Sequence, residues 1–199
     1  MEDQVTVEFD PDTHHRRSIR LKGYDYSQAG AYFFTICTRD RGCLFGEIVD
    51  GEMRLNSLGE IVQDCWDDLP RHYPQIELDA FVIMPNHVHG IVFITDVGAQ
   101  FIAPSAQDTN HAPTLGEIVR AFKARSTRLI RKTDDGTMKQ DAINCAPTGF
   151  GWQRNYYEHI IRDETALNNI RRYIIENPLR WADDEENPIN IRTGEKVCL

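Results

Sequence analysis

Two histidines separated by one residue are the sharpest chemical feature of the sequence. They are His87 and His89, within the segment MPNHVHG at residues 84–90. Side chains at positions i and i+2 of a β-strand point to the same face, so the two imidazoles would be neighbours. Such a pair can bind one divalent cation. The pattern also fits two partly exposed strand histidines that hold no ligand.

A tyrosine and an amide form a second candidate pair. Tyr173 and Asn177 are four residues apart at the end of an expected helix, so they share one helix face. A tyrosine beside a metal-binding amide could attack a phosphate polarised by the metal, giving a covalent phosphotyrosine. Its hydroxyl has an ordinary pKa of about 10 and would need activation. The apolar stripe beside it, including Ile170 and Ile174, equally fits a core or boundary tyrosine.

A ridge of basic residues lies on another expected helix, at residues 114–132. Arg120, Lys123 and Arg131 lie on one face, apart from the buried stripe of the helix. Such a ridge suits a phosphate backbone. An ordinary solvated helix face has the same pattern.

Aromatic and basic residues alternate in the segment GWQRNYYEH at residues 151–159. Arg154, Tyr156 and Tyr157 have the mixture found on surfaces that stack and clamp single-stranded bases. The segment could equally be a buried anchor for a loop. His159 could be an additional metal ligand, although nothing in the spacing singles it out.

The composition is that of an ordinary globular protein. The chain has 199 residues, of which 41% are hydrophobic and 27% charged. This length favours one domain with appendages. No stretch approaches the ~20 apolar residues that cross a bilayer, which excludes a membrane protein. The first residues, MEDQ, are acidic and unlike a secretory signal, so export is not expected.

The cysteines indicate a reducing compartment. They are odd in number, widely spaced and without a C-x-x-C pair, which disfavours a disulfide framework or a cysteine zinc site. We therefore expect a cytoplasmic protein. The five are Cys37, Cys43, Cys65, Cys145 and Cys198.

The net charge of −9 argues weakly against a nucleic-acid partner, but the charge is unevenly distributed. Basic residues gather at 16–22 and 114–132. The acidic excess lies elsewhere, including the run at residues 183–186. The chain is thus acidic overall with local basic elements.

Hydrophobic periodicity and turn signals predict an α+β domain with a mainly antiparallel sheet. We expect strands at 31–38, 76–83 and 87–95 and a hairpin whose turn is Asp50-Gly51. Two capping boxes, Ser57 with Glu60 and Thr114 with Glu117, mark helix starts. The expected helices cover residues 57–69, 114–132 and 163–176, and irregular loops cover 96–113 and 133–149.

We expect three parts along the chain. Residues 1–15 form a loose N-terminal tail, residues 16–181 a single domain, and residues 182–199 an acidic and irregular C-terminal tail.

Taken together, these features resemble the HUH single-tyrosine transposases, and most closely their REP-associated tyrosine transposase branch. The resemblance rests on ordered segments spread over residues 17–181. H-V-H alone is weakly specific, whereas the ordered set is highly specific. The segments cover residues 17–26, 32–38, 81–92, 115–123, 152–162 and 173–178.

The resemblance implies a ferredoxin-like antiparallel sheet with helices packed on it. It also implies a Mg²⁺ or Mn²⁺ ion held by His87 and His89, with Asn177 as the third ligand. Tyr173 matches the nucleophile, which attacks single-stranded DNA and leaves a 5′-phosphotyrosine and a free 3′-OH. Strand transfer reverses this reaction, so no ATP is needed.

The partners implied by the resemblance are single-stranded or hairpin DNA, because REP-associated members recognise short palindromic hairpins. Family relatives include homodimers and monomers. Two alternatives to a strand transferase stay open. One is a catalytically silent protein that binds DNA or RNA hairpins on the same scaffold, and the other is a metal hydrolase that uses activated water.

Overall fold

The structure is a computed structural model that describes residues 23–95, 113–133 and 150–193. The tail expected at residues 1–15 and the basic run at 16–22 lie outside the described residues. So do almost all of the two loops expected at 96–113 and 133–149.

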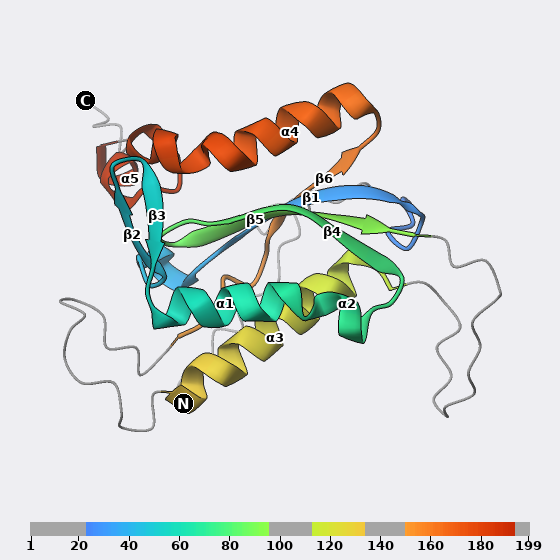
Figure 1. The fold of residues 1–199 in the computed structure, drawn as a ribbon, viewed down its shortest axis with the longest axis horizontal. Coiled ribbons are helices and arrows are strands. Elements are labelled where there is room, and N and C mark those ends of the chain that lie inside the picture. Colours follow the sequence, from blue (N-terminus) through green and yellow to red (C-terminus); the bar gives the residue numbers. More distant parts are fainter. Residues whose placement is uncertain (1–22, 96–112, 134–149, 194–199) are drawn as a thin grey trace, which may run out of the picture.

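A four-stranded antiparallel sheet forms the centre of the molecule, in the strand order β4-β5-β1-β6 (Figure 1). Its strands are β1 (Gly30–Cys37), β4 (Ile76–Ile83), β5 (His87–Ile94) and β6 (Tyr157–Ile161). A separate hairpin of β2 (Gly46–Val49) and β3 (Glu52–Leu55) has the expected Asp50-Gly51 turn.

The connections between the four sheet strands confirm the ferredoxin-like expectation. Two helices, α1 (Ser57–Asp67) and α3 (Leu115–Thr133), connect them in the order β-α-β-β-α-β. The central pair β1 and β5 aligns Thr35 with His89 and Cys37 with His87.

Helices cover both faces of the sheet. Figure 1 shows α1, the short α2 (Leu69–His72) and α3 on one face, and α4 (Glu164–Glu176) alone on the other. The α1/α3 face holds the larger apolar core, which includes Trp66 stacked on Phe81 with ring centroids 4.3 Å apart. The α4 face holds a smaller cluster around Phe33, Ile91 and Ile174. The sheet therefore separates a packing side from a side with fewer apolar residues.

The two expected capping boxes have different outcomes. At α3 the box forms, because the Thr114 amide donates to Glu117 Oε2 at 2.9 Å and the Glu117 amide donates to Thr114 Oγ1 at 3.2 Å. At α1 the prediction that Ser57 caps the helix is wrong, because the capping residue is Asn56, one position earlier. Asn56 is the extended residue, and its Oδ1 accepts from the amides of Leu58 and Gly59. Asparagine and serine cap about equally well, so backbone conformation decides.

The expected element order lacked one strand, β6. It begins within the aromatic and basic segment and ends two residues beyond it, and it pairs with β1 from Thr35↔Tyr157 to Ala31↔Ile161. It is a short edge strand, and its polar residues Glu158 and His159 hide the apolar alternation that marks a strand.

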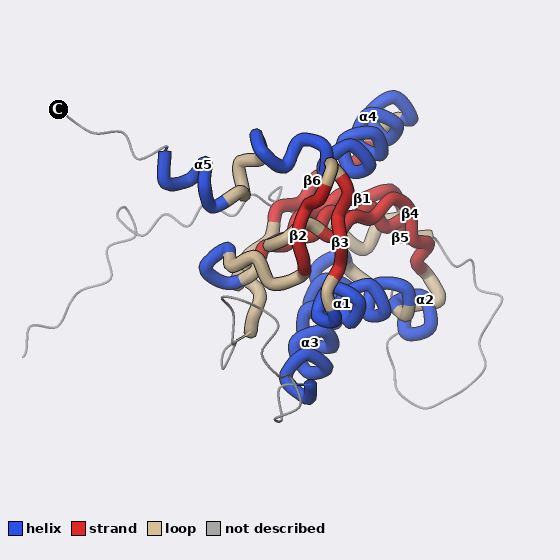
Figure 2. Tube along the Cα trace, turned by 60° about the vertical axis from the view of Figure 1, so that its left-hand side comes forward, coloured by secondary structure: helices blue, strands red, loops and turns tan. Residues whose placement is uncertain are grey.

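The expectation of an irregular segment after residue 181 is also wrong as far as residue 193. The chain forms a 3₁₀ helix, η2 (Asn177–Asp183), and a short helix, α5 (Pro188–Thr193). Two side chains turn the backbone between them, because Asp184 Oδ1 accepts from the Glu186 amide and Asn187 Oδ1 from the Ile189 amide. Figure 2 shows α5 and the β2–β3 hairpin at the same end of the sheet, as Figure 1 does.

Within the described parts of the chain, no helix combines the length and apolar character that a membrane crossing requires.

A substitution at Gly90 tests how tightly the aromatic core packs against the α1/α3 face of the sheet. A Cβ atom there would lie 2.8 Å from the Phe34 ring and 3.1 Å from the rings of Phe81 and Trp66. We expect Gly90→Ala to lower the free energy of unfolding by about 1–3 kcal/mol, because the stacked rings must shift. Chemical denaturation measures this.

Gly42→Ala is the matched control. Its added Cβ atom would meet only Leu44 atoms at an ordinary 3.6 Å, so we expect a change within about 0.5 kcal/mol. Equal stability of the two variants would contradict the tight packing around Gly90.

Candidate metal and tyrosine centre

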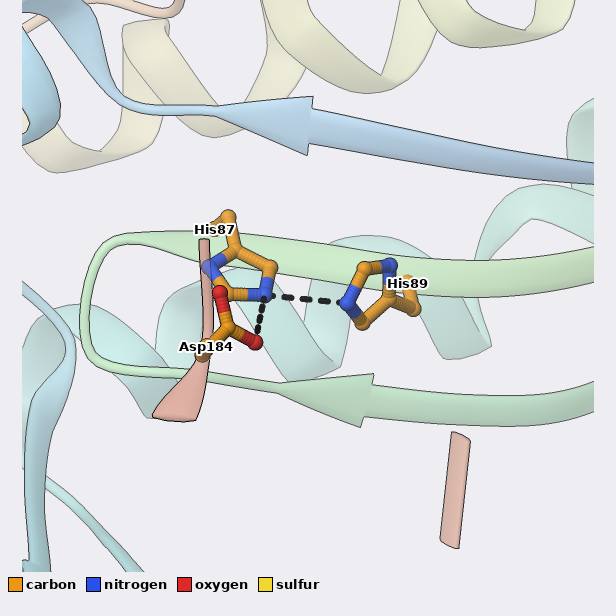
Figure 3. A group of neighbouring side chains, drawn as sticks. All are labelled: His87, His89 and Asp184. Carbon is orange, nitrogen blue, oxygen red and sulfur yellow. Dashed lines mark hydrogen bonds and ion pairs between the residues drawn. The ribbon is translucent and has the colours of Figure 1, made fainter. Parts of the chain in front are cut away.

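Strand β5 presents both histidines to the face covered by α4, as the alternation predicts. Val88 lies between them in sequence and packs in the core on the opposite face. His87 and His89 are buried, and their Nε2 atoms are 3.0 Å apart (Figure 3). The pair thus points two ring nitrogens at one position.

Asn86 determines which nitrogen of His87 carries the proton. The buried Asn86 amide donates its Nδ2 hydrogens to the carbonyls of Arg41 and Glu186, at 3.1 and 2.7 Å. Its Oδ1 is therefore the atom that faces His87 Nδ1, at 2.8 Å. His87 Nδ1 must donate, and the neutral ring keeps a lone pair on Nε2. A partner of this kind typically orients a metal-binding histidine.

Thr35 gives His89 a choice of tautomer. Its hydroxyl lies 2.8 Å from His89 Nδ1 and can rotate to donate or to accept. When it donates, His89 Nε2 carries the proton and can donate to His87. When it accepts, lone pairs of both rings meet, and a cation must separate them. Two ligands at about 2.1 Å from a metal and at a right angle lie about 3.0 Å apart, so the pair fits a cation.

Burial keeps both imidazoles neutral. It lowers the pKa of His89 to about 3 and the pKa of His87 well below its usual range. Neutral imidazole is the form that binds metal, so a cation need not displace a second proton from either ring at neutral pH.

Tyr173 projects from α4 toward the same point. Its hydroxyl is 3.4 Å from His89 Nε2, and its ring meets Phe33 edge-on at a centroid distance of 6.2 Å. The residue is 40% exposed. Burial, followed by the negative charge of Asp184, raises the pKa of Tyr173. The phenol is therefore protonated at neutral pH unless a nearby cation reverses this effect.

Asn177 follows α4 and is 2% exposed. Its Oδ1 is buried and accepts no hydrogen bond from the described residues. A hydrogen bond from the Asn177 side chain acts on Tyr173 and on Asp184 and lowers the pKa of each, against the effect of burial. An unpartnered buried carbonyl oxygen is costly in a metal-free site and is a suitable ligand for a hard cation.

The structure adds Asp184, which the sequence reasoning placed in the acidic tail. Its Oδ2 lies 3.9 Å from His87 Nε2, and its side chain is 8% exposed (Figure 3). Ligand atoms of His87, His89 and Asp184 all lie within 4.8 Å of one another. No spacing signal could have found Asp184, because only the turn after η2 brings it back to β5.

The basic ridge of α3 lines a groove of about 720 Å³ against residues 151–156. This groove lies on the α1/α3 side of the sheet, so the ridge is not beside the histidines. Tyr157 is outside the groove, at the start of β6, and its ring contacts Phe33 on the histidine side. The groove contains most of the residues predicted to bind DNA, namely Arg120, Lys123, Arg131, Arg154 and Tyr156, together with Arg39 and Arg128.

Two basic residues of the groove, Lys123 and Arg120, have different surroundings. Lys123 donates to the carbonyls of Gln153 and Asn155 at 3.0 and 3.2 Å, and burial lowers its pKa to about 8. Lys123 therefore fastens the groove wall to α3. The Arg120 side chain is 78% exposed and its Nη2 lies 4.0 Å from Glu117 Oε1, at the outer limit of an ion pair, so its guanidinium is largely open to solvent.

The sequence has relatives among known proteins. No protein-family profile matches the chain. An uncharacterized protein of Haemophilus influenzae is 42% identical over 188 residues, covering 91% of this chain and 98% of that protein. A second protein of the same organism, named "Putative REP-associated tyrosine transposase", is 28% identical over 156 residues, covering 78% of this chain and 74% of that protein.

The fold has a counterpart among solved structures. A REP-associated tyrosine transposase bound to a REP hairpin superimposes with a TM-score of 0.52 and 19% identity, covering 81% of this chain and 74% of that one. At this identity the likeness concerns the fold. Together with the relative named as a transposase, it shows that the chain resembles the REP-associated tyrosine transposases in sequence and in fold.

Proposed function

We propose that this protein is a metal-dependent endonuclease and strand transferase that acts on single-stranded or hairpin DNA through a 5′-phosphotyrosine intermediate. One observation carries the proposal: the Tyr173 hydroxyl lies 3.4 Å from His89 Nε2, which is itself 3.0 Å from His87 Nε2. A nucleophile and a cation-binding pair thus meet at one partly open position.

His87, His89 and Asn177 would hold the cation, which we expect to be Mg²⁺ or Mn²⁺. When bound, it supplies a Lewis acid that polarises the phosphate and stabilises its developing charge. Asn86 keeps His87 in the tautomer that presents a lone pair on Nε2, and Thr35 allows His89 to adopt the same tautomer. Phe33 stacks against His89 at a centroid distance of 5.6 Å and limits the movement of that ring.

Tyr173 would perform the covalent step. Its phenolic oxygen forms a bond to phosphorus, the bond from phosphorus to the 3′ oxygen breaks, and that oxygen leaves as a 3′-OH. The phenolic proton leaves to solvent and the departing 3′ oxygen takes one proton from solvent, so the step balances; Tyr173 is 40% exposed. A 3′-OH of another strand reverses the step by attacking the phosphotyrosine, so the bond energy is conserved and no ATP is needed.

One chain contains the whole proposed site. Tyr173, His87 and His89 meet without a second copy, which supports action as a monomer.

The groove beside α3 would bind the DNA backbone. Its arginines form a local basic surface on an acidic protein, and phosphate contacts depend on local rather than net charge. Arg120, Arg131 and Arg154 are the proposed phosphate contacts. Tyr156 in the groove and Tyr157 at the edge strand would stack on unpaired bases, leading the strand round β6 toward Tyr173.

Tyr173→Phe should abolish covalent capture of hairpin-bearing single-stranded DNA in the presence of Mn²⁺ and keep its binding. Phenylalanine retains the ring that contacts Phe33 and His89, so folding should survive. A denaturing gel detects the adduct, and a band shift measures binding. Tyr157→Phe is the control and should still form the adduct.

His87→Ala should fail for a different reason, because Tyr173 remains while the cation is lost. An adduct formed by Tyr173→Phe would place the nucleophile elsewhere. Hairpin binding without any adduct from the unaltered protein would favour the silent binder, and metal-dependent hydrolysis without an adduct would favour the metal hydrolase.

Arg120→Glu should weaken hairpin binding and reduce the dependence of log K on log salt by about 1, because one phosphate contact is lost. Fluorescence anisotropy at several salt concentrations measures both quantities. Arg71→Glu is the control, since Arg71 has a similarly exposed side chain on α2, away from the groove. Equal effects of the two variants would make the α3 ridge an ordinary solvated surface.

A further inference from the structure

Asp184 is oriented toward the histidines by a hydrogen bond to its other carboxylate oxygen. Its Oδ1 accepts from the Glu186 amide at 2.6 Å, which leaves Oδ2 facing His87 Nε2 at 3.9 Å. Figure 3 shows the carboxylate beside His87, at the same position where the two imidazoles converge. A solvated acidic tail would not hold one carboxylate oxygen in this way.

A closed ring of contacts connects the carboxylate to the imidazole. The Glu186 amide donates to Asp184 Oδ1, and the Glu186 carbonyl accepts from Asn86 Nδ2 at 2.7 Å. Asn86 Oδ1 in turn accepts from His87 Nδ1 at 2.8 Å. The 3.9 Å gap between His87 Nε2 and Asp184 Oδ2 completes the ring. The contacts that fix the tautomer of His87 therefore also fix the direction of Asp184.

The ring is itself anchored to the rest of the fold. The Arg41 carbonyl accepts the second hydrogen of Asn86 Nδ2, and the Arg41 Nε atom pairs with Glu186 Oε2 at 2.8 Å. This arginine is therefore engaged by Glu186. Among the described residues, the one ion-pair distance that Asp184 makes is to His87.

The charge of Asp184 thus needs a cation. His87 does not provide one, because its Nδ1 hydrogen is donated to Asn86 and its Nε2 lone pair faces His89. A buried carboxylate without a compensating charge is strongly unfavourable. A cation between the imidazoles would remove this cost, and carboxylate oxygen is a preferred ligand of Mg²⁺ and Mn²⁺.

We propose that Asp184 is an additional, anionic ligand of the cation bound by His87 and His89, so that metal binding joins β5 to the segment that follows the tyrosine helix. This proposal rests on the metal centre of the proposed function and adds a ligand to it. The cation would then stabilise the turn between η2 and α5, and with it the end of the helix that carries Tyr173.

The experiment measures Mn²⁺ binding to the full chain by titration calorimetry, without DNA. Asp184→Asn keeps the Oδ1 acceptor for the Glu186 amide and removes the charge, so the fold should persist. We expect its Mn²⁺ affinity to fall by about tenfold or more. The control is Glu185→Gln, an exposed neighbour in the same acidic run, whose affinity should change by less than about twofold.

A second measurement, the melting temperature with and without Mn²⁺, tests metal binding even if a substitution changes the stability of the protein. Mn²⁺ should raise the melting temperature of the unaltered protein by mass action, and this metal-dependent shift should be smaller in Asp184→Asn than in Glu185→Gln. Equal Mn²⁺ affinity and equal shifts in these two variants, with binding lost in His87→Ala, would overturn the role of Asp184 alone. Unchanged binding in His87→Ala would instead overturn the metal centre of the proposed function.

Discussion

The 3.0 Å contact between two buried imidazole nitrogens is the constraint on which the rest of the site depends. Two lone pairs cannot face each other there, so a proton or a cation must lie between them. Thr35 permits either state, because its hydroxyl can reverse direction, whereas Asn86 commits His87 to presenting a lone pair. The hydrogen-bond partner is thus adjustable at His89 and fixed at His87.

The sheet places the larger apolar core and the histidine pair on opposite faces, so the buried polar groups do not interrupt the packing of that core. Along β5, His87 and His89 face α4, while Val88 and Gly90 face the aromatic core under α1 and α3. That core contains more apolar residues than the cluster under α4, so the α4 side can contain polar groups and a half-exposed tyrosine. The absence of a side chain at Gly90 serves the core, although it adjoins the histidine pair in sequence.

Local patterns predicted the parts of the site that depend on period and spacing. Strand alternation placed His87 beside His89, and four-residue helical spacing placed Tyr173 near Asn177. Asp184 could not be predicted, because its position depends on a turn made by its own Oδ1 and on a carbonyl that reaches back to Asn86, 98 residues away from Asp184 in the sequence. β6 was missed for a related reason, since an edge strand with charged residues is defined by its partner β1 more than by its own composition.

The position of Tyr173 depends on a contact two residues away along α4. Arg171 donates through Nε and Nη2 to both carboxylate oxygens of Asp79, which lies at the irregular register in β4 between Leu78 and Phe81. This two-point contact fixes the helix against the sheet in rotation as well as in distance. The contact that holds α4, and with it Tyr173, therefore starts from a residue at a departure from regular strand pairing. The sheet carries both the histidines, on β5, and the residue that positions α4, on β4, so Tyr173 and the two imidazoles are held relative to each other through one sheet.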